Sequence, residues 1–268
     1  MLYRITDWND AYANGAHIPD ADGYAPRWTD AARAFHTSHP PRPLGRGHLF
    51  LPEGQPRGLM VFVHGGYWMR FDPSVWSHLA AGALAAGWAC AMPAYTLAPQ
   101  ARIAAMTAEV AEAVADAAAR VDGPIALTGH SAGGHLAARM VCVGVLPDRV
   151  AARVTACVPI SPLTDLRPLM RTAMNDTLRL DPTEAWAESP ALQEPRPGIP
   201  VTTWVGGMER PEFIRQARLL ADIWAGLGAA TDCVIDPGLH HFDVIDALGR
   251  PDSPLMRRLL DQGLRQTA

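Results

Sequence analysis

Short apolar runs alternate with amphipathic helical patterns along most of the chain, and this alternation constrains the fold more than any other feature. Strand and helix patterns alternate at least four times, and the strand segments are continuous apolar runs rather than alternations of apolar and polar residues. Such strands are buried on both faces, as in a mostly parallel sheet with helices on both sides. The sequence therefore predicts an α/β fold. The predicted strands lie at 47–52, 58–63, 88–93, 124–129, 153–160, 199–207 and 230–236.

The helical patterns between these strands carry recognisable ends. In the stretch 72–87, Asp72 can cap the first turn, Pro73 suits the first helical position and Gly87 can end the helix. The first two strands resemble a hairpin, so antiparallel pairing stays open for them. The other predicted helices lie at 103–121, 133–145 and 210–228.

We expect a single domain over 1–268, with two segments outside the alternating pattern. Residues 1–45 mix aromatic, proline and polar residues and are interpreted as an N-terminal arm packed on the body. Residues 162–198 are rich in proline and polar residues, and we expect an insertion there over the active site. No repeat or flexible linker divides the chain.

Composition excludes several kinds of function. The net charge of -4 is mild, so neither a nucleic acid nor an anionic membrane is an expected partner. All 23 basic residues are arginines, which excludes chemistry that needs a lysine, such as a Schiff base or a phosphate-binding loop. The four cysteines are scattered through apolar runs without metal-ligand spacing, so we expect free, buried thiols in a reducing compartment.

The segment "IALTGHSAGGHLAARMV" at 125–141 places one serine, Ser131, between a predicted strand and a predicted helix. Gly129-His130-Ser131-Ala132-Gly133 matches the G-x-S-x-G pattern in strand–turn–helix context, which is typical of a nucleophilic serine. The small neighbours satisfy a steric need, because side chains would collide across so sharp a turn. The alternative is that Ser131 is merely small enough for the corner.

Two further glycines follow the strand at 58–63. In "HGGYW", Gly65 and Gly66 leave backbone N–H groups unshielded, and together with the N–H of Ala132 they can surround a developing oxyanion. The alternative is a glycine turn braced by a structural His64. Both patterns in one chain are more specific than either alone.

An acid and a base are needed to complete a serine nucleophile. Glu209 follows the strand at 199–207 and is favoured as the acid, while Asp165 after the strand at 153–160 is its rival. His240 and His241 follow the last predicted strand and compete for the role of base. We expect no metal, because the histidines lack ligand spacing on a helix face.

These residues carry a resemblance to α/β-hydrolases of the HGG-bearing esterase type, and within them to kynurenine formamidase (arylformamidase) and its bacterial relatives. The matching segments are "HGGYW" at 64–68, "GHSAGGHL" at 129–136, "GGMERPEFIRQ" at 206–216, "HHFDVID" at 240–246 and "WNDAYANGAHIP" at 8–19. The resemblance implies Ser131 as nucleophile, Glu209 as acid and His241 as base, with Gly65, Gly66 and Ala132 forming the oxyanion hole. Many relatives have Asp where this chain has Glu209.

The resemblance also implies an activity: hydrolysis of a small aryl formamide such as N-formylkynurenine in tryptophan catabolism, without a cofactor. A carboxylesterase for small acyl or aryl esters is the alternative. Tyr67 and Trp68 are candidates to flank a substrate ring, and Trp186 is a weaker one. Aromatic residues in such places are also often core residues. The expected partner is a small molecule, and a homodimer stays open. The N-terminus lacks the basic and apolar stretches of a signal peptide, so we expect a cytoplasmic location.

Overall fold

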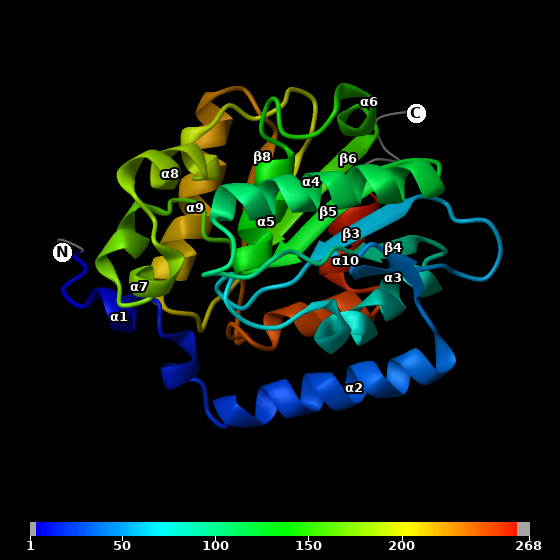
Figure 1. The fold of residues 1–268 in the computed structure, drawn as a ribbon, viewed down its shortest axis with the longest axis horizontal. Coiled ribbons are helices and arrows are strands. Elements are labelled where there is room, and N and C mark those ends of the chain that lie inside the picture. Colours follow the sequence, from blue (N-terminus) through cyan, green and yellow to red (C-terminus); the bar gives the residue numbers. More distant parts are fainter. Residues whose placement is uncertain (1–3, 262–268) are drawn as a thin grey trace.

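A single eight-stranded sheet forms the centre of the molecule (Figure 1). The computed structural model describes residues 4–261. The strand order is β1-β2-β4-β3-β5-β6-β7-β8, and β4, β3, β5, β6, β7 and β8 run parallel to one another. The strands are β1 (Arg42–Leu44), β2 (Gly47–Phe50), β3 (Leu59–Val63), β4 (Ala89–Met92), β5 (Ile125–His130), β6 (Val154–Ile160), β7 (Val201–Gly206) and β8 (Thr231–Asp236).

The predicted α/β fold is confirmed, and the edge strands add a correction. β2 is antiparallel to its partners β1 and β4, and the first two predicted strands, which became β2 and β3, are not paired with each other. β1 was missed because it has three residues and two of them are exposed, so it leaves no apolar run. The parallel core matches its signal well: all residues of β3, β4 and β5 are buried.

Helices cover both faces of the sheet, and each face has its own apolar core (Figure 1). One core joins α4 (Ile103–Arg120), α5 (Ala132–Met140) and α9 (Pro211–Gly226) to the sheet. The other joins η3 (Pro73–Ala80), α3 (Ala81–Ala85), η6 (Val244–Gly249) and α10 (Pro254–Leu260). The segment at 72–87 is helical and capped by Asp72, whose side chain accepts from the Ser74 N–H at 2.8 Å, but most of it is 3₁₀-helix rather than α-helix. α6 (Asp148–Ala151) precedes β6.

The N-terminal arm wraps along one side of the molecule (Figure 1). Its short helix α1 lies beside the insertion, and its long helix α2 packs against η3. The arm contains α1 (Trp8–Ala11), η1 (Asn14–His17), η2 (Ala21–Gly23) and α2 (Tyr24–Ser38). The insertion between β6 and β7 contains η4 (Arg167–Arg171), α7 (Asn175–Leu178), α8 (Pro182–Ala187) and η5 (Pro190–Leu192). Within 4–261, no helix is long and apolar enough to cross a membrane.

Candidate active site

Ser131 sits in the sharp turn between β5 and α5. Its backbone has φ 57° and ψ −116°, a conformation that side chains adopt only under strain. A Cβ atom on Gly129 would collide with the carbonyl of Gly133, and one on Gly133 would collide with the carbonyl of Val63. The small flanking residues are therefore a steric requirement. The Ser131 N–H donates to the Ile160 carbonyl at 2.8 Å, which ties the turn to β6.

His241 and Glu209 form a short, buried ion pair or hydrogen bond. His241 Nδ1 lies 2.6 Å from Glu209 Oε2, and both side chains are almost inaccessible to solvent. The other carboxylate oxygen, Oε1, accepts from Ser161 Oγ at 2.6 Å and from the Gly206 N–H at 2.8 Å. A carboxylate with three donors is firmly oriented, so it holds the imidazole in one tautomer with Nε2 facing away.

The rival residues have other partners. Asp165 makes two contacts of 2.9 Å with the guanidinium of Arg167. His240 Nε2 lies 3.0 Å from the Tyr24 hydroxyl, and its Nδ1 accepts from the Phe242 N–H at 3.2 Å. The structure thus pairs Glu209 with His241 and leaves neither rival in contact with this pair in the described residues.

Two positioning residues escaped the sequence reasoning. Ser161 follows β6, and the signal that could have found it is its place at the carboxyl end of a strand. His130 donates from Nε2 to the His241 carbonyl at 2.8 Å, and the two rings lie 4.5 Å apart. Burial, and next the neighbouring His241, hold the pKa of His130 well below its usual value, so this ring is neutral. Its role is to hold the loop that carries His241.

The glycine loop after β3 lies against the serine turn. A Cβ on Gly65 would come within 3.2 Å of the Ser131 Cβ, and Gly66 has φ +110°. In the described part of the chain, the N–H groups of Gly65, Gly66 and Ala132 have no protein acceptor. His64 braces this loop: its ring stacks on Tyr95 at 4.4 Å, and burial lowers its pKa to about 4, so it stays uncharged. The loop therefore offers backbone donors beside Ser131.

A cavity of about 870 Å³ opens at this point and is lined by both Ser131 and His241. Tyr67 lines it, as expected, and its hydroxyl donates to the Tyr12 carbonyl. Trp68 does not line it: the side chain is fully buried in the core, with its ring edge-to-face against His135 at 5.1 Å. The prediction for Trp68 is therefore wrong, because the backbone turn after Tyr67 directs the next side chain inward. Trp186 is 55% exposed and lies outside the cavity.

Half of the residues that line the cavity come from the arm. Arm residues from Asn9 to Trp28 line it, whereas the insertion contributes only Ala173 and Met174. The expectation that the insertion covers the site therefore needs changing, since the arm takes the larger share. Phe71, Trp76 and Phe242 add aromatic surface.

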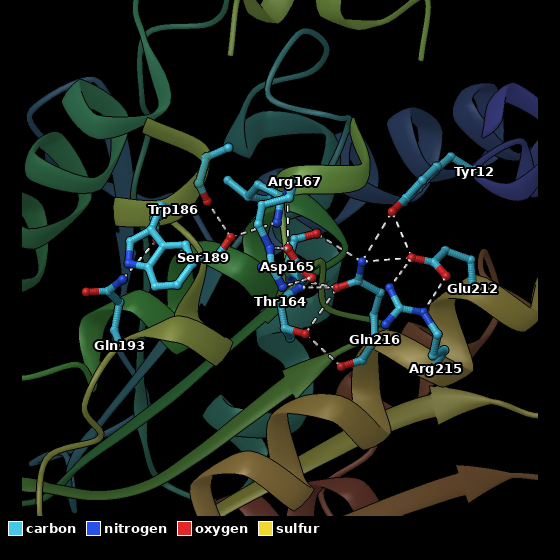
Figure 2. Close-up of polar contacts among 12 residues, drawn as sticks. Tyr12, Thr164, Asp165, Arg167, Trp186, Ser189, Gln193, Glu212, Arg215 and Gln216 are labelled. Carbon is cyan, nitrogen blue, oxygen red and sulfur yellow. Dashed lines mark hydrogen bonds and ion pairs between the residues drawn. The ribbon is translucent and has the colours of Figure 1, made fainter. Parts of the chain in front are cut away.

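A buried polar network ties the arm to α9 and to the start of the insertion (Figure 2). The Tyr12 hydroxyl donates to Glu212 Oε1 at 2.8 Å, and Arg215 pairs with both oxygens of Glu212 at 2.7 Å. The amide of Gln216 donates to Glu212 and to the Asp165 carbonyl, and it accepts from the N–H groups of Thr164 and Asp165. The network anchors the arm next to the loop that carries Glu209.

The site is built from protein donors and acceptors, with no sign of metal ligation in the residues described. No group of three or more His, Cys, Asp or Glu side chains there is arranged to hold a metal ion. Cys90, Cys142 and Cys157 are free and buried, and Cys233 is free and half-buried.

Comparison with known proteins agrees with this geometry. A family model described as "alpha/beta hydrolase fold" matches residues 60–196, which include the glycine loop, the serine turn and nearly all of the insertion. The chain belongs to the α/β-hydrolase family. A hydrolase of this family is an enzyme whose sites lie where strands end, as Ser131, Glu209 and His241 do here.

The hydrolase has relatives of two kinds. Kynurenine formamidases from Salmo salar and Drosophila melanogaster are 25% and 27% identical to it, each over 75% of this chain and 71% of the relative. A crystal structure from Silicibacter sp. TM1040, described as a candidate thioesterase, is 50% identical with a TM-score of 0.90, covering 94% of this chain and 98% of that one. An esterase from Pyrobaculum calidifontis, 19% identical with a TM-score of 0.68 over 94% of this chain and 96% of that one, shares the fold.

Proposed function

We propose that this hydrolase cleaves a small aryl formamide such as N-formylkynurenine to formate and the free aniline, through a formyl-enzyme intermediate. Ser131 is the nucleophile, His241 the base and Glu209 the acid that orients it. The N–H groups of Gly65, Gly66 and Ala132 form the oxyanion hole. This activity would place the protein in tryptophan catabolism, in the cytoplasm.

The observation that carries the proposal is the 2.6 Å contact between His241 Nδ1 and Glu209 Oε2, with His241 and the strained Ser131 lining one cavity. With Nδ1 donating to the carboxylate, Nε2 is unprotonated and can accept the Ser131 proton. Glu209 and His241 are both buried, so bulk water does not compete for the contact between them.

The steps follow from these atoms. His241 Nε2 takes the proton of Ser131 Oγ as Oγ forms a bond to the formyl carbon. The carbonyl oxygen becomes an oxyanion and accepts from the three backbone N–H groups, each worth on the order of 3 kcal/mol at the transition state. His241 then gives its proton to the aniline nitrogen, and the C–N bond breaks. Water, deprotonated by His241, hydrolyses the formyl ester, which releases formate and restores Ser131.

The substrate class is supported by the relatives and by the cavity. Relatives named kynurenine formamidase match three-quarters of the chain. The cavity wall carries Tyr67, Phe71, Trp76 and Phe242, which offer flat apolar surface to an aryl ring. The aniline of an aryl amide is also a better leaving group than the amine of an alkyl amide, because its nitrogen lone pair is delocalised into the ring.

A carboxylesterase acting on small acyl or aryl esters is the second candidate. The 50% identical relative is described as a thioesterase, and the same three side chains would serve esters and thioesters. Tyr67 would flank the substrate in either case.

Steady-state rates separate the two candidates. We expect kcat/KM for N-formylkynurenine to exceed that for p-nitrophenyl acetate and for a short acyl thioester. An ester or thioester preferred by orders of magnitude would overturn the formamidase proposal while leaving the hydrolase mechanism intact. Labelling of Ser131 by a fluorophosphonate probe, absent in Ser131→Ala, checks the nucleophile independently of substrate.

A further inference from the structure

The cavity carries few charged side chains, and one of them is an unneutralised cation. Asp20, Asp22 and Arg70 are the acidic and basic side chains that line it. Asp20 pairs with Arg27 at 3.0 Å. Arg70 is exposed at the cavity and has no ion pair anywhere in 4–261. Its guanidinium is therefore available to a negatively charged group of a ligand.

A second donor in the same wall is buried and unpartnered. Asn14 is 4% exposed and lines the cavity. Its Oδ1 accepts from the Arg210 N–H at 3.1 Å, which fixes the orientation of the amide and leaves Nδ2 on the other side. Nδ2 has no acceptor among the residues that the structure describes. Leaving a buried donor without a partner costs free energy, so an unpartnered donor in a cavity wall is a candidate ligand contact.

Tyr67 links the arm segment that carries Asn14 to the loop that carries Arg70. The Tyr67 hydroxyl and the backbone N–H of Asn14 both donate to the Tyr12 carbonyl, the backbone N–H at 3.1 Å. Arg70 lies three residues beyond Tyr67 in the loop that also carries the oxyanion donors. Asn14, Tyr67 and Arg70 therefore line the same cavity as Ser131 and His241.

We propose that Arg70 and Asn14 bind a carboxylate on the leaving group of the substrate. The inference rests on the proposed function for the location of the reacting bond. It adds that the leaving group carries a carboxylate at the end remote from that bond. A carboxylate has two acceptor oxygens, one for the guanidinium and one for the amide N–H. A plain anilide or alkyl ester offers neither. Asp22, without an ion pair in the described chain, adds a negative charge to the same cavity, which suits an ammonium beside that carboxylate, as in an α-amino acid head group.

The test compares substrates with and without the acid. The first pair is N-formylkynurenine and N-(2-acetylphenyl)formamide, which share the ring, the ketone and the formamide. The second pair, 4-acetoxybenzoate and phenyl acetate, serves if the protein prefers esters. The measured quantity is the ratio of kcat/KM for the acid-bearing member to that for the neutral member.

Two substitutions probe the two donors. Arg70→Gln removes the charge from an exposed side chain, and Asn14→Asp keeps the acceptor for the Arg210 N–H while replacing the donor by a carboxylate oxygen. We expect each to lower the ratio about 10-fold or more, mainly through KM of the acid-bearing substrate. Arg42→Gln, at an exposed arginine of β1 outside the cavity, is the matched control and should leave the ratio unchanged.

The outcomes separate this inference from the proposed function. If both variants keep the wild-type ratio in the substrate class that the protein turns over, the carboxylate site is wrong, whichever class that is. If esters are preferred but the ratio falls in both variants, the carboxylate site holds and the formamidase proposal fails.

Discussion

The two walls of the active-site cavity are held in place by different kinds of interaction. On the catalytic wall, which carries the proposed nucleophile Ser131 and the proposed base His241, each of these residues follows a strand of one sheet, and strand pairing sets their relative position. On the arm wall, the position of the backbone depends on side-chain contacts such as Tyr12 to Glu212, between residues 200 apart in sequence. The first wall carries the chemistry, and the second surrounds the substrate.

The two walls of the cavity therefore have different roles in the hydrolase. The catalytic wall is closely packed: its glycines have no room for a Cβ, and buried hydrogen bonds orient its side chains. The arm wall rests on a small set of polar contacts, so it can vary without disturbing the sheet. We therefore expect changes on the catalytic wall to lower kcat and changes on the arm wall to alter KM and stability.

The largest effect is expected for Ser131→Ala. Removing the nucleophile should lower kcat by about 10⁶-fold, while the free energy of unfolding measured in urea stays close to that of the wild type. Ser77→Ala is the control, since Ser77 is buried in η3 outside the cavity and should keep its kcat. A large loss of stability in Ser131→Ala would mean that the serine is there for its size.

The next largest effect is expected for Glu209→Gln. A neutral amide cannot hold the His241 tautomer or stabilise its protonated ring, so kcat should fall by about 10⁴-fold. Asp165→Asn, which alters a carboxylate paired with Arg167, should change kcat only slightly. The reverse pattern in single-turnover kinetics would assign the acid to Asp165.

The third expected effect is a loss of stability at acid pH, caused by the buried histidines His64, His130 and His135. Burial lowers the pKa of His64 and of His135 to about 4 and holds the pKa of His130 well below its usual value. In the unfolded chain these groups titrate near 6.5. Between pH 6.5 and 4 the unfolded state therefore binds more protons, and the free energy of unfolding falls as pH falls, by about 1.4 kcal/mol per pH unit for each histidine.

Urea unfolding at pH 7, 6 and 5 measures that slope. His135→Gln should make the loss shallower, because one of the three groups no longer titrates. A free energy of unfolding that does not change between pH 7 and 5 would mean that the folded state takes up as many protons as the unfolded state, which contradicts the lowered pKa values of these rings.

The smallest effect is expected for Tyr12→Phe on the arm wall. The buried Glu212 carboxylate and the Gln216 amide lose a hydrogen-bond partner, so the free energy of unfolding should fall by about 1–2 kcal/mol. KM should rise more than kcat falls, because the arm shapes the cavity. Tyr24→Phe, whose hydroxyl contacts His240 instead, is the matched arm control. A kcat loss comparable to that of Glu209→Gln would erase the distinction between the two walls.

Sequence alone determined the α/β fold, the serine turn and the family, because continuous apolar strands and clash-prone glycines leave local signatures. It also placed the candidate acids and bases, since residues after parallel strands meet at one edge of the sheet, while the preference for His241 over His240 came from the family resemblance. Where signals were not local, it fell short: β1 is too short and exposed to produce an apolar run, and nothing in "HGGYW" says that Tyr67 faces the cavity while Trp68 turns into the core.

The segments that close the cavity and the contacts that orient the Glu209 carboxylate are visible only in the folded chain. The contacts of Tyr12, Asn14 and Ser161 join segments far apart in sequence, so no periodicity or spacing records them. Their geometry depends on how the finished sheet brings the arm against α9. A pattern read along the chain can locate the reacting groups, but the shape offered to a substrate exists only once distant segments have packed together.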